Sequence, residues 1–280
     1  MNCYINDNVN PNVNANDNLN DNANVIPKTI HYCWFGGKKK PKSVMQCIAS
    51  WRKHCPDYVI KEWNEQNFDV NAIPYTRDAY KAGKYAFVSD VARFWVLYYE
   101  GGVYFDTDVE LIKSIDELVE RGAFMGWEKA DALGNMHVAP GLGLAAPKGF
   151  PFYKKVLDGF AELPYYLNDG QRNPYTMIPL VTDLLKQKGL RMDGTMQKLN
   201  LIDNANPNPN DNANVKDVGV NVITIYPADY FCPMDSLTGE IKRTNNTYTI
   251  HHYSMSWLPR CTQWRVKFMR GVRGLLKHQR

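Results

Sequence analysis

The sequence Val103-Tyr-Phe-Asp-Thr-Asp-Val109 places two carboxylates, Asp106 and Asp108, one residue apart directly after a short apolar run. The β-branched and aromatic residues at 103–105 predict a short buried strand. Two negative charges this close repel each other, and a nearby cation is the usual way to keep both ionised. Mg²⁺ and Mn²⁺ prefer oxygen ligands and often complete their coordination with substrate phosphates. Although an Asp-x-Asp pair is also common in turns, the stretch predicts half of a site for a metal ion and a diphosphate.

Residues 85–102 precede this strand and predict a buried helix. The segment is apolar on nearly every side, and Gly101 and Gly102 stand where a C-terminal cap belongs. Asp90 and Arg93 are three positions apart, so they share one edge of the helix. The alternative to a functional pair is an internal Asp–Arg pair that satisfies only itself. The direct connection of this helix to the Asp-x-Asp strand favours a functional pair.

These motifs resemble a known family. Ser89-Asp90-x-x-Arg93 followed by Gly101-Gly-Val-Tyr-Phe-Asp106-Thr-Asp108 is similar to the signature of glycosyltransferase family 32, whose sugar-binding region contains a DXD motif. The similarity extends to residues 26–37 and 251–257. The family includes capsular-polysaccharide synthesis enzymes. The resemblance implies an α/β fold of the GT-A-like nucleotide-diphospho-sugar transferase type, with a mostly parallel central sheet and flanking helices.

The resemblance also implies a reaction and a set of site residues. The chain would be a metal-dependent hexosyltransferase that moves a sugar from a nucleotide-diphosphate donor to a glycan or lipid-linked acceptor in surface polysaccharide synthesis, with retention at the anomeric carbon. The implied ligands of Mn²⁺ or Mg²⁺ are Asp108 and His251, together with Asp106, which would either ligate the ion or bond the ribose of the donor. The implied catalytic residues are Asp90, Arg93, Asp106 and Asp108. The implied donor-binding residues are Trp34, Gly36, Ser89, Asp90, Arg93, Asp106, Ser256 and Trp257.

Two of these assignments have alternatives. His251 and His252 are successive residues of a predicted strand, so their side chains point to opposite faces and only one easily reaches the metal. His252 is the second choice. Trp34 is expected to pack on the nucleotide base, and a core aromatic residue is the alternative. Ser256 and Trp257 are expected in a flexible segment that closes on the donor.

We expect three parts along the chain. Residues 26–258 form the GT-A-like domain. Residues 1–25 are dominated by Asn and Asp, which predicts a disordered tail, and residues 203–217 repeat this composition as a loop insertion. Residues 259–280 carry apolar residues at helical spacing among Lys and Arg. They predict a basic amphipathic helix, either on an anionic membrane surface or docked on the core.

Apolar patterns predict how strands and helices alternate. Ligands of parallel sheets bind at the carboxyl ends of strands, so Trp34, Gly36 and the Asp106/Asp108 pair should share one rim, with Glu128 at the same cleft. The GxGxxA string at 141–146 predicts a tight turn, because a proline and a glycine follow where a dinucleotide-binding helix would run. The predicted strands are 28–35, 58–63, 103–105, 123–128, 220–226 and 247–253, and the other predicted helices are 41–53, 112–120, 150–160 and 175–188.

The amino-acid composition limits the classes of protein to which the chain can belong. The 280 residues, 44% hydrophobic and 22% charged, are typical of one sizeable globular core. No apolar run is long enough to predict a membrane-spanning helix. The six scattered cysteines form no CxxC pair, and the start of the chain lacks the pattern of a secretory signal. We therefore expect free thiols and a cytoplasmic protein, at the inner face of the membrane if the basic tail binds there. The net charge of +4 comes without a basic stripe carrying aromatic residues, so we expect no nucleic-acid binding.

Two other functions fit parts of the sequence. Residues 106–108 also match the DxD part of the DxDx[TV] pattern of haloacid-dehalogenase-like phosphatases, in which Asp106 would attack phosphate. Those enzymes place the motif on the first strand, whereas two predicted strands and a helix precede it here. A noncatalytic, membrane-peripheral interaction protein with Asn-rich segments is the other alternative.

Overall fold

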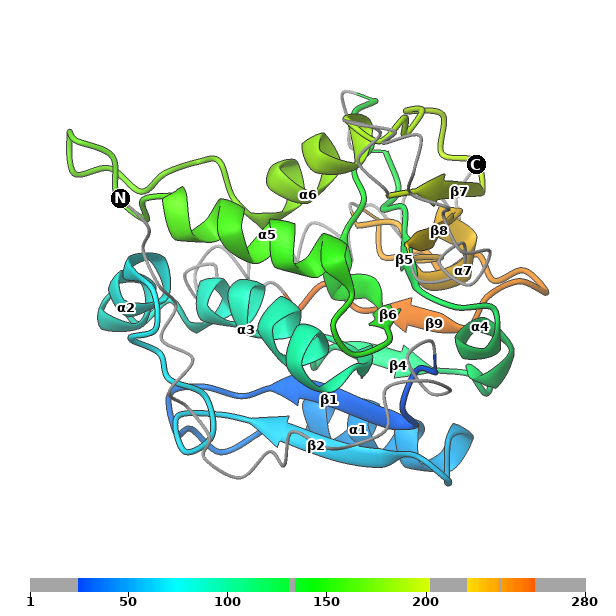
Figure 1. The fold of residues 1–280 in the computed structure, drawn as a ribbon. Coiled ribbons are helices and arrows are strands. Elements are labelled where there is room, and N and C mark those ends of the chain that lie inside the picture. Colours follow the sequence, from blue (N-terminus) through cyan, green and yellow to red (C-terminus); the bar gives the residue numbers. More distant parts are fainter. Residues whose placement is uncertain (1–24, 131–133, 202–220, 237, 255–280) are drawn as a thin grey trace, which may run out of the picture.

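The chain folds as an α/β protein in three layers, with helices on both faces of a central sheet (Figure 1). The structure is a computed structural model that describes residues 25–130, 134–201, 221–236 and 238–254. The helices are α1 Lys42–His54, α2 Pro74–Lys81, α3 Tyr85–Glu100, α4 Asp116–Glu120, α5 Pro151–Glu162, α6 Met177–Lys186 and α7 Ala228–Phe231, with a 3₁₀ turn at Pro140–Leu142. The strands are β1 Thr29–Cys33, β2 Val59–Trp63, β3 Gly102–Tyr104, β4 Val109–Leu111, β5 Phe124–Gly126, β6 Leu144–Ala146, β7 Gln197–Asn200, β8 Val222–Tyr226 and β9 Thr249–His251.

Seven strands form the central sheet in the order β2-β1-β3-β6-β5-β8-β7. β2, β1, β3, β5 and β8 run in one direction, and β6 and β7 run in the opposite direction. The predicted mostly parallel sheet with flanking helices is therefore confirmed, with two reversed strands that the sequence did not predict. β4 and β9 form a separate antiparallel pair, in which Val109 lies opposite His251.

Successive residues of the central strands face different helix layers. Tyr104 points into the core shared with α3, α5 and α6, and Val103 points into the core shared with α1 and α7. A sheet covered on both faces needs apolar residues on both, which explains the continuous apolar run before Asp106. α3 lies beside α5 over one face of the sheet (Figure 1). β3 is thus fixed in the middle of the sheet, and the DXD motif follows at its carboxyl end.

His31 on β1 is fully buried, and both of its ring nitrogens have partners. Nε2 lies 2.9 Å from the carbonyl oxygen of Gly101, and Trp63 Nε1 donates to Nδ1 at 3.0 Å. Nδ1 must accept and Nε2 must donate, so the ring is neutral with its proton on Nε2. Burial lowers the pKa of His31 to about 4. The ring therefore joins the end of α3 to two strands only while it is uncharged.

This buried histidine predicts a loss of stability in acid. The unfolded chain protonates the ring near its ordinary pKa of 6.5, whereas the folded chain protonates it only near 4, so stability is lost as the pH falls through this window. His31 alone should contribute a loss of about 3 kcal/mol. Urea unfolding of the wild type and of His31→Gln across this pH range measures the effect. The variant should show the shallower pH dependence, and equal slopes would contradict the assignment.

Several elements differ from the sequence prediction. The helix expected at 112–120 begins only at Asp116, because residues 109–111 pair with β9 as β4. The turn expected at 141–146 is limited to the 3₁₀ turn, and Leu144–Ala146 form strand β6 between β3 and β5. A fully buried strand of three residues shows no alternation that would reveal it. α2 and β7 were not predicted.

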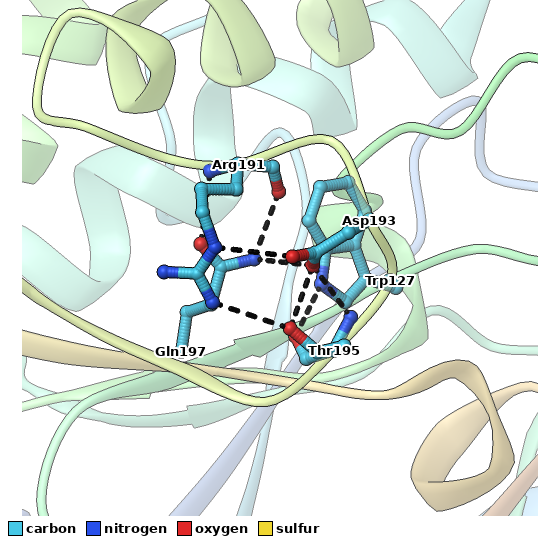
Figure 2. Close-up of polar contacts among 5 residues, drawn as sticks. All are labelled: Trp127, Arg191, Asp193, Thr195 and Gln197. Carbon is cyan, nitrogen blue, oxygen red and sulfur yellow. Dashed lines mark hydrogen bonds and ion pairs between the residues drawn. The ribbon is translucent and has the colours of Figure 1, made fainter.

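A polar network fixes the turn before β7 (Figure 2). The Asp193 carboxylate accepts hydrogen bonds from the Thr195 N–H at 3.0 Å and from its hydroxyl at 2.6 Å, and Gln197 Nε2 donates to it at 3.1 Å. Trp127 Nε1 donates to the Thr195 carbonyl oxygen at 3.0 Å (Figure 2). Because Trp127 directly precedes Glu128, the network holds the chain in place where it leaves β5.

Three predictions concern residues that the structure does not describe. Apart from residue 25, the expected tail at 1–25, the loop at 203–217 and the basic helix at 259–280 lie outside the described residues and stay predictions. Among the helices that are described, none is both long and apolar enough to cross a membrane.

Candidate metal centre

A cavity of about 800 Å³ lies where β1 and β3 end. Its walls come from the residues after these two strands, the first half of α3, the 3₁₀ turn and the end of β9. The predicted site residues that line it are Trp34, Ser89, Asp90, Arg93, Asp106, Asp108 and His251. Residues from distant parts of the sequence thus share one rim of the sheet, as parallel-sheet topology predicts.

Asp106, Asp108 and His251 converge inside this cavity. Each offers one ligand atom, and these atoms all lie within 4.8 Å of one another. Asp106 and Asp108 follow β3 directly. His251 reaches them because β9 pairs with β4, the strand that begins just after the motif. The structure therefore brings together the three residues that the resemblance implied as metal ligands.

The segment 251–254 holds Asp108 through three contacts. His251 Nε2 lies 3.2 Å from Asp108 Oδ1, and the Ser254 N–H donates to Oδ2 at 2.7 Å. The His252 N–H donates to the main-chain oxygen of Asp108 at 2.9 Å. Both carboxylate oxygens and the backbone are thus fixed relative to the imidazole of His251.

The two aspartates differ in their protonation equilibria. Burial opposes ionisation of Asp108, but the charge of His251 and hydrogen bonds from His251 and Ser254 outweigh it and hold the pKa of Asp108 below its ordinary value. Burial raises the pKa of Asp106, and the negative charge of Asp108 raises it further although Arg93 opposes the shift. Burial alone would lower the pKa of His251, but Asp108 raises it overall. The carboxyl groups of Asp106 and Asp108 therefore both lie close to the imidazole of His251.

This set of donors fits a divalent metal ion. Carboxylate oxygens suit Mg²⁺ and Mn²⁺, and a single imidazole is compatible with a transition-metal ion. His251 Nδ1 is buried and has no hydrogen-bond partner among the described residues. A cation between Asp106 and Asp108 would offset the repulsion that raises the pKa of Asp106.

Arg93 connects α3 to the DXD motif. Its side chain is only 3% exposed, and Nη2 lies 2.9 Å from Asp90 Oδ1 and 3.1 Å from Asp106 Oδ1. The Tyr104 hydroxyl also donates to Asp106 Oδ1, at 3.1 Å. The alternative in which Asp90 and Arg93 satisfy only each other is therefore wrong, because Arg93 also pairs with the first aspartate of the motif.

Arg93 retains one donor group for a ligand. Its Nη1 is buried and has no partner among the described residues. A Cβ atom at Gly141 would come within 3.1 Å of this nitrogen and 2.1 Å of Asp106 Oδ2. Only glycine lets the 3₁₀ turn approach so closely. Since an unpaired buried donor costs free energy, an oxygen of a bound ligand would be stabilised here.

Trp34 and Ser89 line the cavity from two elements. Trp34 follows β1, and its Nε1 donates to the Lys38 carbonyl oxygen at 2.6 Å. The Ser89 hydroxyl donates to the Tyr85 carbonyl oxygen, one turn earlier in α3, at 3.2 Å. Trp34 also packs against the core shared with α1, so both interpretations of this residue have a structural basis.

Gly36 is not among the residues that line the cavity. It adopts φ of +86°, and a Cβ there would lie 2.2 Å from the ring of Tyr85, which does line it. The structure thus gives Gly36 a role in the turn behind the cavity wall. Ser256 and Trp257 lie outside the described residues.

The two adjacent histidines have different partners. His252 Nε2 lies 2.8 Å from Glu110 Oε2, so His251 alone joins the aspartate cluster. Glu128 lines the cavity, as its position after β5 predicts.

Sequence reasoning assigned no site role to Gly141 or Tyr253, although both line the cavity. The close approach of Gly141 to Asp106 depends on tertiary contacts that the GxGxxA string does not reveal. Tyr253 has φ of +48°, and nothing in the residue type predicts a left-handed conformation for tyrosine.

Several known proteins are similar to parts of this chain. Residues 41–125 match the family model of the glycosyltransferase sugar-binding region containing a DXD motif. Toxin Afp18 of Yersinia ruckeri is 33% identical over 103 residues, which cover 36% of this chain and 5% of the toxin. Inositol phosphoceramide mannosyltransferase 3 of Schizosaccharomyces pombe is 28% identical over 140 residues, which cover 47% of this chain and 36% of that protein. This chain therefore matches well under half the length of either relative.

Two solved structures are similar to this chain. The PaToxG glycosyltransferase has 23% identity and a TM-score of 0.46, and the match covers 59% of this chain and 70% of that chain. Galactosyltransferase LgtC, solved with donor and acceptor sugar analogues, has 12% identity and a TM-score of 0.40, with 88% of this chain and 95% of that chain covered.

Residues 41–125 are therefore similar to the glycosyltransferase sugar-binding region of the DXD type. Within residues 41–125 this confirms the resemblance to glycosyltransferase family 32 that Asp90, Arg93, Asp106 and Asp108 indicated in the sequence. His251 lies outside the matched residues, and its place in the site comes from the structure.

Proposed function

We propose that this chain is a metal-dependent hexosyltransferase that moves a sugar from a nucleotide-diphosphate donor to a glycan or lipid-linked acceptor, with retention at the anomeric carbon, in surface polysaccharide synthesis. The observation that carries the proposal is the meeting of Asp106, Asp108 and His251 in one cavity with the unpaired Nη1 of Arg93. The similarity to a mannosyltransferase supports transfer of a hexose.

Asp106, Asp108 and His251 would hold the metal ion. The ion would supply positive charge to the departing diphosphate. Asp108 is ionised at neutral pH, because His251 and Ser254 hold its pKa below the ordinary value. We favour Mn²⁺ over Mg²⁺, since one of the three donors is an imidazole.

Arg93, Asp90 and Trp34 would bind the donor. The unpaired Nη1 of Arg93 offers a charge-assisted hydrogen bond to a phosphate or sugar oxygen. The carboxyl group of Asp90, whose pKa burial raises to about 6, would bind sugar hydroxyls beside it. Trp34 would pack on the nucleotide base at the end of β1. Ser89 supports the same wall of the cavity.

We further propose that the reaction takes place in the cytoplasm at the inner face of the membrane. Residues 259–280, rich in Lys and Arg, would contact anionic lipid there. This placement would bring a nucleotide donor and a lipid-linked acceptor to the same surface.

The phosphatase alternative has less support. Its pattern belongs on the first strand of the fold, whereas β1 and β2 both precede β3 in this chain. β3 also lies between β1 and β6 inside a mixed sheet. The mixed sheet and the late position of the motif favour the transferase.

A screen of nucleotide sugars tests the proposed function. The protein is incubated with a panel of uridine- and guanosine-diphosphate sugars with and without Mn²⁺, and released nucleoside diphosphate is measured. We expect release from at least one donor, and a chelator should stop it. Release of inorganic phosphate from a phosphomonoester, with no hydrolysis of any donor, would overturn the proposal in favour of the phosphatase.

A further inference from the structure

Tyr253 has a backbone conformation that its residue type disfavours. Its φ of +48° lies in the left-handed region, and it is the one non-glycine residue with positive φ in the described part of the chain. A bulky side chain in this region is strained. Such strain persists only where surrounding contacts hold it, and it is concentrated at functional sites.

Contacts with His251 and Cys232 help to hold the ring of Tyr253 in the wall of the cavity. The ring meets the imidazole of His251 edge to face, with centroids 4.4 Å apart and planes at 73°. The hydroxyl lies 2.7 Å from Sγ of Cys232, a fully buried residue that follows α7. The ring thus supports one side of the His251 imidazole and is anchored to a separate element.

The left-handed turn also directs the next backbone N–H. The chain runs extended through β9 and turns at Tyr253, so the Ser254 N–H reaches Asp108 Oδ2 at 2.7 Å. An extended residue at 253 would carry position 254 onward along the strand direction. The same turn therefore fixes His251 through the ring and Asp108 through the backbone.

We propose that Tyr253 is a positioning residue for the metal centre: its strained turn and anchored ring keep His251 and Asp108 at the separation that a shared metal ion requires. The proposal rests on the proposed metal site at Asp106, Asp108 and His251. Tyr253 acts through two ligands and holds no metal itself. Groups that orient metal ligands typically change metal affinity about 10- to 100-fold when they are removed.

Three substitutions separate the turn from the ring. Tyr253→Phe keeps the ring and loses the hydroxyl, Tyr253→Ala loses the ring but keeps a Cβ that strains the turn, and Tyr253→Gly loses the ring but adopts positive φ freely. Mn²⁺ affinity of the full chain is measured by titration with electron paramagnetic resonance, without substrate. Thermal unfolding is measured separately in the presence of a chelator. Tyr230→Phe is the matched control, because Tyr230 stacks on Tyr226 and does not line the cavity.

The expected order of Mn²⁺ affinity is wild type and control highest, then Tyr253→Phe, then Tyr253→Gly, with Tyr253→Ala lowest. Tyr253→Ala should weaken binding about tenfold or more. Tyr253→Gly should bind Mn²⁺ more tightly than Tyr253→Ala and melt at a higher temperature, the reverse of the usual ranking, because the turn is preserved. Ala and Gly variants that bind Mn²⁺ as the wild type does, with only lower melting temperatures, would overturn this inference and leave the metal site intact. A wild type that binds no Mn²⁺ would overturn the metal site itself.

Discussion

Asp108→Asn is expected to reduce metal-dependent hydrolysis of the proposed donor by about a thousandfold or more, because it removes the charge that would hold the metal at the leaving group. The amide has nearly the same shape and can still accept the Ser254 hydrogen bond. It carries no negative charge for His251 or for a metal ion. The rate of nucleoside diphosphate release at saturating donor and Mn²⁺ measures the effect.

Glu110→Gln is the matched control for this variant. It makes the same change from carboxylate to amide two residues further along the chain, where Glu110 pairs with His252 and is 39% exposed. Such a pair contributes little, so hydrolysis should stay within about threefold of the wild type. If Asp108→Asn kept the donor affinity and Mn²⁺ dependence of the wild type, the noncatalytic interaction protein would become the better description.

Arg93→Met is expected to lower the free energy of unfolding by about 3–5 kcal/mol, because it removes a buried cation and leaves two partly buried carboxylates without their partner. Met retains most of the length of the side chain, so the main loss is the charge that faces Asp90 and Asp106. Urea unfolding near neutral pH in the presence of a chelator measures the change.

Two further variants test whether the loss of stability in Arg93→Met comes from the carboxylates that Arg93 contacts. Arg77→Met removes an exposed guanidinium paired with Asp78, and it should cost no more than about 1 kcal/mol. Adding Asp90→Asn to Arg93→Met should recover part of the stability, since one of the two uncompensated charges is removed. A loss of the same size in Arg77→Met and Arg93→Met would show that burial of the Arg93 cluster has no special energetic role.

Much of the fold could be predicted from local sequence patterns. The long apolar run before Gly101 and Gly102 predicts α3, and β1, β2 and β8 follow from strand-forming residues. β4 and β6 could not be found in this way, because they are defined as strands by their pairing with β9 and with β3 and β5. Very short strands depend on tertiary pairing more than on their own composition.

The residues of the candidate site also differ in whether the local sequence could predict their contacts. Asp106 and Asp108 could be paired from the sequence because they are local, whereas His251 was inferred from a family resemblance and placed by the pairing of β4 with β9. The second contact of Arg93, to Asp106, depends on how α3 is rotated against the sheet. No sequence spacing encodes that rotation, so a self-contained Asp90–Arg93 pair remained open until the structure was known.

Because His251 lies on β9, ligand binding in the cavity is coupled to the docking of β9 on β4. A cation or nucleotide that needs His251 binds only molecules in which β9 is in place, so by mass action rising ligand concentration depletes the undocked population. β9 would therefore be most labile when the proposed donor is scarce, and the cellular supply of activated sugar would itself protect the protein from degradation.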